Sequence, residues 1–210
     1  MLIRRYNLAA TFTAIIVVIV TAAAFVLPWH HHLMERRLIS LDVALTTEEV
    51  YYLQGVTYWT GSSSRSYSYD TDPWSSTPVH SFMDKISVVV VLGLVSSLAL
   101  AALAFLGFRR FALIAGIASL ILSVCSVLFF FLWFGDAVPD GYNFEGFFSD
   151  KTTGDSIIIT HEVWGPMSGW WFMIAAAVIQ CFALLFVALS EGRVKTDPRI
   201  RPYRSLSSRP

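Results

Sequence analysis

Four long runs without a charged side chain or a histidine most constrain how this chain can fold. They cover residues 8–27, 86–108, 111–134 and 167–189. Each reaches the length of about 20 residues that a helix needs to cross about 30 Å of hydrocarbon. Helices are expected because a lipid-embedded backbone must satisfy its own hydrogen bonds, and no run alternates as a barrel strand does. Only 14% of the residues are charged, against about 25% in soluble domains, which also favours a membrane protein.

The charged residues divide unequally between the two sides of this four-span arrangement. One side holds ten Lys and Arg against two acids, and the other holds five against thirteen, although the formal net charge is zero. The basic side contains Arg4, Arg5 and the turn at Arg109 and Arg110. Because positively charged loops remain in the cytoplasm, both termini are predicted to be cytoplasmic. The expected location is the cell membrane, with multiple spans and outer loops at residues 29–85 and 135–166.

The first run also has features of a cleavable signal peptide, since Arg4 and Arg5 precede it and small residues occupy 22–24. Retention is favoured because the run is longer than the about 7–15 apolar residues of a signal sequence. The predicted organisation has a four-helix transmembrane domain at residues 1–192 and a basic, disordered cytoplasmic tail at 193–210. Its spans lie at about 8–28, 86–108, 111–134 and 167–189.

Both outer loops contain sequence typical of strands. In the first loop, residues 37–45 partly alternate and residues 49–60 are rich in β-branched and aromatic side chains. They predict two antiparallel strands joined near residues 46–47, followed by an irregular segment at 61–78. Residues 155–164 in the second loop form a third strand candidate. The predicted fold class is an all-α membrane protein, a four-transmembrane-helix bundle with a small extracellular antiparallel β-sheet from both loops, because neither loop alone covers its strand edges.

All five histidines lie in the outer loops, near predicted helix ends; they are His30, His31, His32, His80 and His161. If those ends converged, His30 or His32 could meet His80 and His161 around Zn²⁺ or Cu²⁺. The alternative is a polar rim at the boundary between membrane and water. The rim is favoured because no HxxxH or HExxH spacing places two histidines on one helical face. No metal ligand is therefore assigned.

The sequence offers little chemistry for catalysis or transport. It has no nucleophile–base pair, no Gly-rich phosphate loop and no paired-Cys motif, and Cys125 and Cys181 both lie within spans. No span contains a histidine, which disfavours a haem-carrying subunit. The spans also lack charged residues, which disfavours an ion or proton path. The protein is predicted not to be an enzyme, with no catalytic residue and no cofactor.

A few polar and small residues within the spans indicate how the helices pack. Small residues recur at four-residue spacing, at Gly93, Ser97 and Ala101 and again at Ala112 and Gly116. Such stripes permit close approach of two helices in lipid. Gln180 is expected to form a hydrogen bond with a neighbouring helix. Three tryptophans at the start of the fourth span predict an interfacial aromatic belt; they are Trp164, Trp170 and Trp171.

The order of these features resembles the claudin and peripheral-myelin-protein group of tetraspan membrane proteins. The shared order is a short N-terminus, a long strand-bearing first outer loop, a tight Arg-containing turn, a shorter second loop and a basic tail. Trp29, Trp59 within TYWTG and the WGPMSGWW stretch at residues 164–171 are similar to that family's placement of aromatics. The two cysteines of the family's first loop are absent here, so the resemblance implies a fold and not tight-junction function.

Two functions are compatible with this sequence. The first is a structural, adhesion or complex-assembly role, in which the outer sheet binds another protein or a second copy of the chain. The second is a small transporter or a metal-handling protein that uses the outer histidines. The expected partners are the lipid bilayer and a protein, and nucleic acid is not expected.

Overall fold

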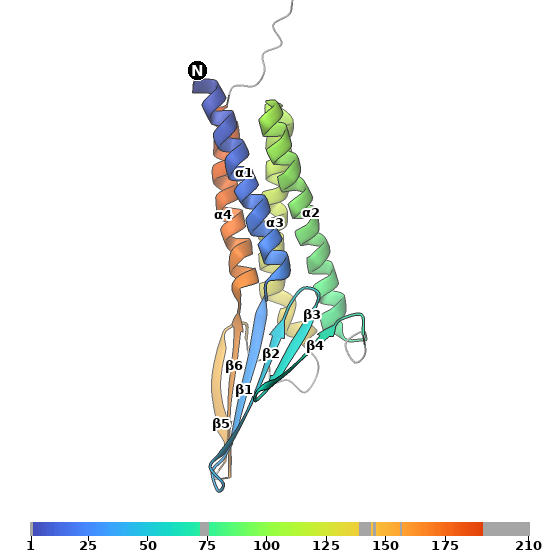
Figure 1. Ribbon diagram of the computed structural model, residues 1–210, viewed down its shortest axis with the longest axis vertical. Helices are drawn as coiled ribbons and strands as arrows, with labels where there is room; N and C mark the ends of the chain where they lie inside the picture. Colours follow the sequence, from blue (N-terminus) through green and yellow to red (C-terminus); the bar gives the residue numbers. More distant parts are fainter. Residues whose placement is uncertain (1, 72–75, 139–143, 145, 156, 191–210) are drawn as a thin grey trace, which may run out of the picture.

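Four long helices lie side by side with a β-sheet at one end in the computed structural model, which describes residues 2–71, 76–138, 144, 146–155 and 157–190 (Figure 1). The helices are α1 (Leu2–Val26), α2 (Pro78–Leu106), α3 (Arg109–Ala137) and α4 (Ser168–Leu189). All four are long and apolar enough to span a membrane, as the sequence predicts. In the bundle, α1 and α3 each contact both α2 and α4.

The second helix is longer than predicted at its sheet end. It begins at Pro78 and not near residue 86, with Pro78 in the first turn and the Thr77 side chain accepting a hydrogen bond from the His80 N–H at 3.4 Å. Proline and a threonine cap are typical of a helix start. At its other end, Gly107 adopts a left-handed conformation with φ 76°, and α3 starts two residues later. A tight turn between the second and third helices is therefore present as predicted, but it lies at Gly107 and Phe108, and Arg109 and Arg110, which were expected to form it, begin α3.

One six-stranded sheet combines the two loops between helices, as the sequence predicts. The first loop supplies β1 (His30–Leu38), β2 (Val43–Tyr51), β3 (Gly55–Thr60) and β4 (Ser63–Ser68), and the second supplies β5 (Ser149–Gly154) and β6 (Ile158–Pro166). The strand order is β4-β3-β2-β1-β6-β5, and all neighbouring strands are antiparallel. The central strand β1 joins the loops, because it pairs with β2 on one side and β6 on the other.

The strand boundaries differ from the prediction in three places. The first hairpin turns at residues 39–42 and not at 46–47, with Asp42 in the left-handed region at φ 49°. Residues 49–60 do not form one strand, because a turn at 52–54 separates β2 from β3. The segment expected to be irregular contains β4, and β5 was not predicted. The predicted disorder of the tail concerns residues outside those that the structure describes.

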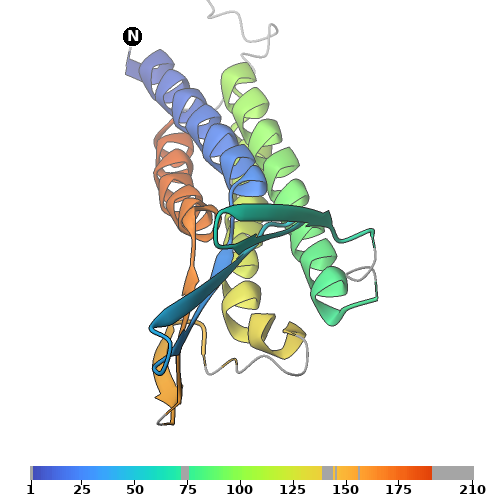
Figure 2. The same ribbon diagram turned by 60° about the horizontal axis from the view of Figure 1, so that its bottom comes forward.

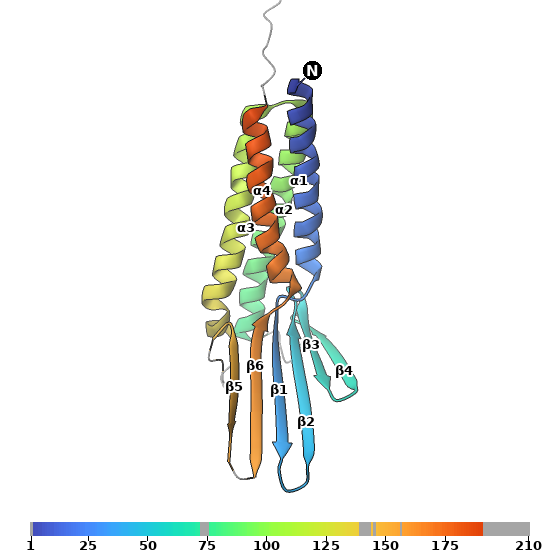
Figure 3. The same ribbon diagram turned by 90° about the vertical axis from the view of Figure 1, so that its left-hand side faces the viewer.

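Four of the strands form a long blade that points away from the helices. Figure 3 shows β1, β2, β5 and β6 running together beyond the helix ends, whereas the β3–β4 hairpin diverges from them; Figure 2 shows the same divergence from another side. At about 3.3 Å per residue, the nine residues of β1 span about 30 Å. Burial changes along this strand from His30, which is fully buried, to the exposed Arg36 and Arg37. The far end of the blade is thus exposed in the part of the chain that the structure describes.

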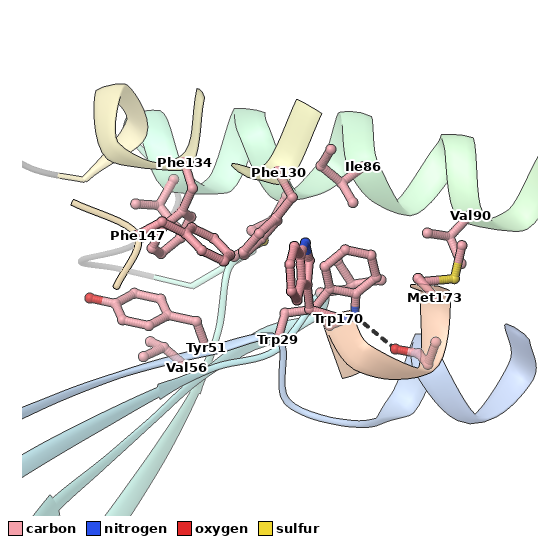
Figure 4. Close-up of a cluster of buried hydrophobic side chains, with 14 of the residues drawn as sticks. Trp29, Tyr51, Val56, Ile86, Val90, Phe130, Phe134, Phe147, Trp170 and Met173 are labelled. Atoms are coloured by element: carbon pink, nitrogen blue, oxygen red, sulfur yellow. Dashed lines mark hydrogen bonds between the residues drawn. The ribbon is translucent and has the colours of Figure 1, made fainter. Parts of the chain in front are cut away.

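An aromatic core joins the sheet to the helices (Figure 4). It contains Trp29, Tyr51, Phe130, Phe134, Phe147, Trp164 and Trp170. The β2–β3 turn enters this core, since Leu53 is 1% exposed and the Gln54 side chain donates to the Phe25 carbonyl at 2.7 Å. The Gly169 N–H also donates to the Pro28 carbonyl at 2.7 Å. These contacts fix the sheet against the ends of α1 and α4.

Small and polar residues hold the helices together below this core. Gly93, Ser97, Ala112 and Gly116 are buried and Ala101 is partly buried, which confirms the predicted small-residue stripes as packing surfaces. The hydroxyls of Ser97 and Ser119 are 2.6 Å apart across α2 and α3. The Gln180 side chain donates to the Gly116 carbonyl at 3.3 Å, as predicted.

Candidate functional site: the sheet and its two ends

The first histidine of the triplet is part of the aromatic core. His30 is 0% exposed, and its ring centroid lies 4.7 Å from that of Phe134 and 4.8 Å from that of Phe147. Its Nε2 is 3.1 Å from the Phe147 carbonyl oxygen, so Nε2 carries the proton and donates. Burial lowers the pKa of His30 from 6.5 to about 3. At neutral pH this side chain is therefore an uncharged packing and hydrogen-bonding group.

The third histidine lies between two carboxylates on the same face of the sheet. His32 Nδ1 is 3.7 Å from Glu49 Oε2, and Nε2 is 3.9 Å from Glu162 Oε2. Its ring stacks on Trp164 with centroids 3.8 Å apart and an interplanar angle of 10°. The Tyr51 hydroxyl also donates to Glu49 at 2.7 Å. This buried polar group belongs to the junction and faces the helices rather than open water.

The predicted polar rim of histidines is therefore wrong for His30 and His32. Alternation along β1 places these two on the covered face, while His31 points to the opposite face, near Gly165. The rim description fits His161 better, since its side chain is 38% exposed and bonded to Asp150 at 2.7 Å. His80 lies on α2, 3.2 Å from Asp84 and 3.6 Å from Asp70.

The histidines do not come together around one point. His32 is opposite Trp164 in the register and His161 is opposite Glu35, so the two rings lie on different faces of the sheet. Within the part of the chain that the structure describes, no group of three or more His, Cys, Asp or Glu side chains is placed to hold a metal ion. The geometry thus offers no support for the metal-handling alternative.

The predicted aromatic belt is also mostly wrong. Trp164 and Trp170 are 2% and 6% exposed and belong to the core. Only Trp171 points outward, with half of its surface exposed. Tryptophan is common both at membrane boundaries and in tightly packed cores, so the sequence alone could not separate the two.

The far end of the blade carries a surface that the sequence analysis missed, which we call the distal tip. It consists of six exposed aliphatic side chains in and beside two adjacent turns: Ile39, Leu41, Val43, Leu45, Ile157 and Ile158. The exposed Ile159 lies on the opposite face of the sheet, because it is next to Ile158 in β6. Leu41 is the most exposed of them, at 69%. The Ile39 N–H donates to the Ile157 carbonyl at 3.0 Å and holds the two turns together. The signals in the sequence were the run of three isoleucines beside a turn and the alternating apolar residues at 39–45.

Charged groups surround the distal tip and fix its two turns. The Arg37 guanidinium donates to Asp42 at 2.6 Å across the β1–β2 turn. In the β5–β6 turn, Asp155 accepts hydrogen bonds from the backbone N–H groups of Ile157 and Ile158 at 2.7 and 2.9 Å. These two bonds lower the pKa of the Asp155 carboxyl. The aliphatic side chains are thus presented by ordered turns with an ionic border.

Together these features define a class of protein: a four-helix multi-pass membrane protein with an antiparallel sheet packed on one end of the bundle. Comparison with known proteins does not narrow this class. No protein-family model matches the chain, and no curated protein matches its sequence.

Proposed function

We propose that this protein is a non-enzymatic membrane protein that binds another protein through the distal tip of its sheet. The observation that carries the proposal is the group of six exposed aliphatic side chains in and beside two turns that are bonded to each other. Scattered apolar residues on a surface need no explanation, but a contiguous apolar patch with a polar border is typical of an interaction site. Leu38 in β1 is opposite Val43 in β2 and Ile158 in β6, so these three side chains form a continuous row on one face of the sheet.

The position of the distal tip supports an adhesion or complex-assembly role. It lies about 30 Å of strand beyond the helix ends, where lipid of the same membrane does not reach it. The charge distribution supports an orientation with the sheet outside and both termini in the cytoplasm. At the opposite end of the bundle, the Arg109 side chain donates to the Ala188 carbonyl at the end of α4, at 2.6 Å. The claudin-like assignment rests on the tetraspan layout, with one sheet built from both loops.

Site-specific photo-crosslinking tests the proposal. A photoreactive amino acid at position 41, in cells that express the full chain, is expected to give an adduct of defined mass in native membranes. Adding Ile157→Glu should abolish the adduct because it places a charge in the patch. The matched control is Ser64→Glu, which adds the same charge at an exposed position on β4 away from the patch.

The outcomes separate binding from folding. Both glutamate variants replace exposed side chains, so both should keep the thermal stability of the wild-type protein. The proposal fails if position 41 gives no adduct, or if Ser64→Glu lowers the yield of the adduct as much as Ile157→Glu does. An adduct with twice the mass of the chain would identify the partner as a second copy.

A further inference from the structure

A groove opens between the sheet-side ends of α2 and α3. Its volume is about 560 Å³, within the range of about 300–1,000 Å³ that is usual for ligand sites. Phe82, Ile86 and Val89 line it from α2, and Phe129 and Trp133 line it from α3. Phe129 and Trp133 keep 41% and 46% of their surfaces exposed. The walls are therefore apolar and open to the surroundings of the bundle.

Two opposite charges lie at the water end of this groove. Lys85 and Asp136 both line it and are both exposed. The contact between Ser97 and Ser119 sets the relative level of the two antiparallel helices. From that contact Lys85 is twelve residues toward the sheet and Asp136 is seventeen, so Asp136 lies about 8 Å farther from the membrane centre. The backbone of the lysine is thus the deeper of the two.

We propose that this groove binds one zwitterionic phospholipid from the leaflet next to the sheet. A phospholipid presents its phosphate next to the glycerol and its cationic amine beyond it, in the same order as Lys85 and Asp136 along the groove. Lysine can extend its side chain along apolar surface while its ammonium group reaches the headgroup level. One acyl chain lies along Ile86, Val89 and Phe129, which belong to the charge-free part of the two helices.

The choice of lipid over other occupants follows from where the groove opens. Its inner part faces the region that lipid fills around any spanning helix, so no partner has to be recruited. An anionic lipid would match Lys85 but would place Asp136 beside a headgroup without a cation. A zwitterionic headgroup satisfies both charges, which predicts discrimination between two lipid classes with identical acyl chains.

Tryptophan quenching by brominated lipids can test this proposal, because Trp133 forms part of the groove. The full chain is reconstituted in phosphatidylglycerol vesicles that contain a small fraction of brominated phosphatidylcholine or brominated phosphatidylglycerol. The quenching of Trp133 is obtained by subtracting the fluorescence of the Trp133→Phe variant from that of the wild-type protein. Trp171 serves as the control for lipid that merely surrounds the bundle, since it is exposed on α4 and lies outside the groove.

Quenching of Trp133 is expected to report a preference of about threefold for phosphatidylcholine, as one ion pair at a wet boundary allows. Asp136→Asn should bring the preference to about one. Lys85→Gln should weaken the quenching of Trp133 by both brominated lipids, because both carry a phosphate. The matched control Asp84→Asn removes an acid beside Lys85 that does not line the groove, and it should leave the preference unchanged.

Three results would overturn the proposal. Equal quenching of Trp133 by the two brominated lipids would exclude recognition of the headgroup. The same preference at Trp171 would assign it to the bulk lipid around the protein. No quenching of Trp133 by either lipid would show that protein, for example a second copy of the chain, covers the groove. The comparison of Trp133 with Trp171 decides the question even if the Asp136 variant does not fold.

Discussion

Replacement of His30 tests how the junction between sheet and helices is built. His30 is surrounded by the rings of Phe134 and Phe147, and its Nε2 donates to the Phe147 carbonyl. A protonated imidazolium at this position would be a charge without water around it, which is why burial lowers the pKa to about 3. His30→Phe preserves a flat ring of similar size, removes the titrating group and leaves the carbonyl without its donor.

The sign of the pH effect follows from which state binds the proton. Above pH 6.5 the side chain is neutral in the folded and unfolded states, so it contributes no pH dependence. As the pH falls from 6.5 toward 3, the unfolded chain binds a proton and the folded protein does not. The unfolded state is therefore favoured progressively, and the free energy of unfolding decreases as the solution becomes more acidic.

The magnitude can be worked out for a single step in pH. With pKa values of 6.5 unfolded and about 3 folded, acidification from pH 7.5 to 5 lowers the free energy of unfolding by about 2 kcal/mol. At pH 5 this loss is set almost entirely by the unfolded-state pKa, because the folded side chain remains neutral there. His30→Phe should lack this loss, although the unsatisfied Phe147 carbonyl costs it about 1–3 kcal/mol at both pH values.

Unfolding in mixed micelles of dodecyl sulfate and a mild detergent, followed by tryptophan fluorescence, measures the effect at pH 7.5 and pH 5. The stability advantage of the wild-type protein over His30→Phe should shrink by about 2 kcal/mol between the two pH values. Phe130→Leu is the matched control, because Phe130 is fully buried in the same core but cannot titrate. Its destabilisation should be the same at both values. If wild type and His30→Phe lose equal stability on acidification, the reasoning is refuted.

Three further predictions follow from the packing and the topology. Gly169→Ala should cost about 1–3 kcal/mol in the same unfolding assay, because the added methyl group would lie 2.6 Å from the Trp29 ring and 2.7 Å from a backbone oxygen. Gly93→Ala, whose methyl group would be 3.6 Å from Leu122, should cost less, and equal losses would contradict the packing. Ser119→Ala removes the hydrogen bond between the buried Ser97 and Ser119 hydroxyls and should cost about 0.6 kcal/mol, measured in the same way. Reporter fusions at the two ends of the chain should report the same side of the membrane, and opposite sides would refute the four-span topology.

The helices could be predicted because their signal is local. A run of about 20 uncharged residues has one stable arrangement in lipid, and the four runs correspond to the four helices. The sheet-side end of α2 was missed because His80, Asp84 and Lys85 are polar, although the helix includes them and begins at a threonine cap and a proline. A hydropathy profile identifies only the apolar part of a helix, whereas the helix itself extends to its capping residues.

The strands were predicted less well, because alternation does not reveal where a hairpin turns. Ile39, Leu41, Val43 and Leu45 alternate as in one strand, but the chain reverses within this stretch. Asp42 was the local signal, since aspartate tolerates a left-handed conformation better than most residues do. The apolar residues of this stretch have no core to face, which is why they form the distal tip rather than the interior of a sheet.

The environment of the histidine triplet could not be predicted from local sequence. Strand alternation alone would have placed His30 and His32 on the same face and His31 on the other. Which face is buried depends on Phe134 and Phe147, which follow more than a hundred residues later. A polar triplet at the end of an apolar run was interpreted as a boundary with water, and long-range packing reversed that interpretation for two of its three residues.

The two proposed surfaces can be tested independently because they lie far apart in the molecule. The distal tip is about 30 Å of strand away from the helix ends, and the groove lies between those helix ends themselves. Ile157→Glu should therefore abolish crosslinking at position 41 without changing the lipid preference at Trp133. Asp136→Asn should do the reverse. If either substitution changed both measurements, the sheet and the helices would be coupled through the aromatic core, and His30→Phe would then alter the lipid preference as well.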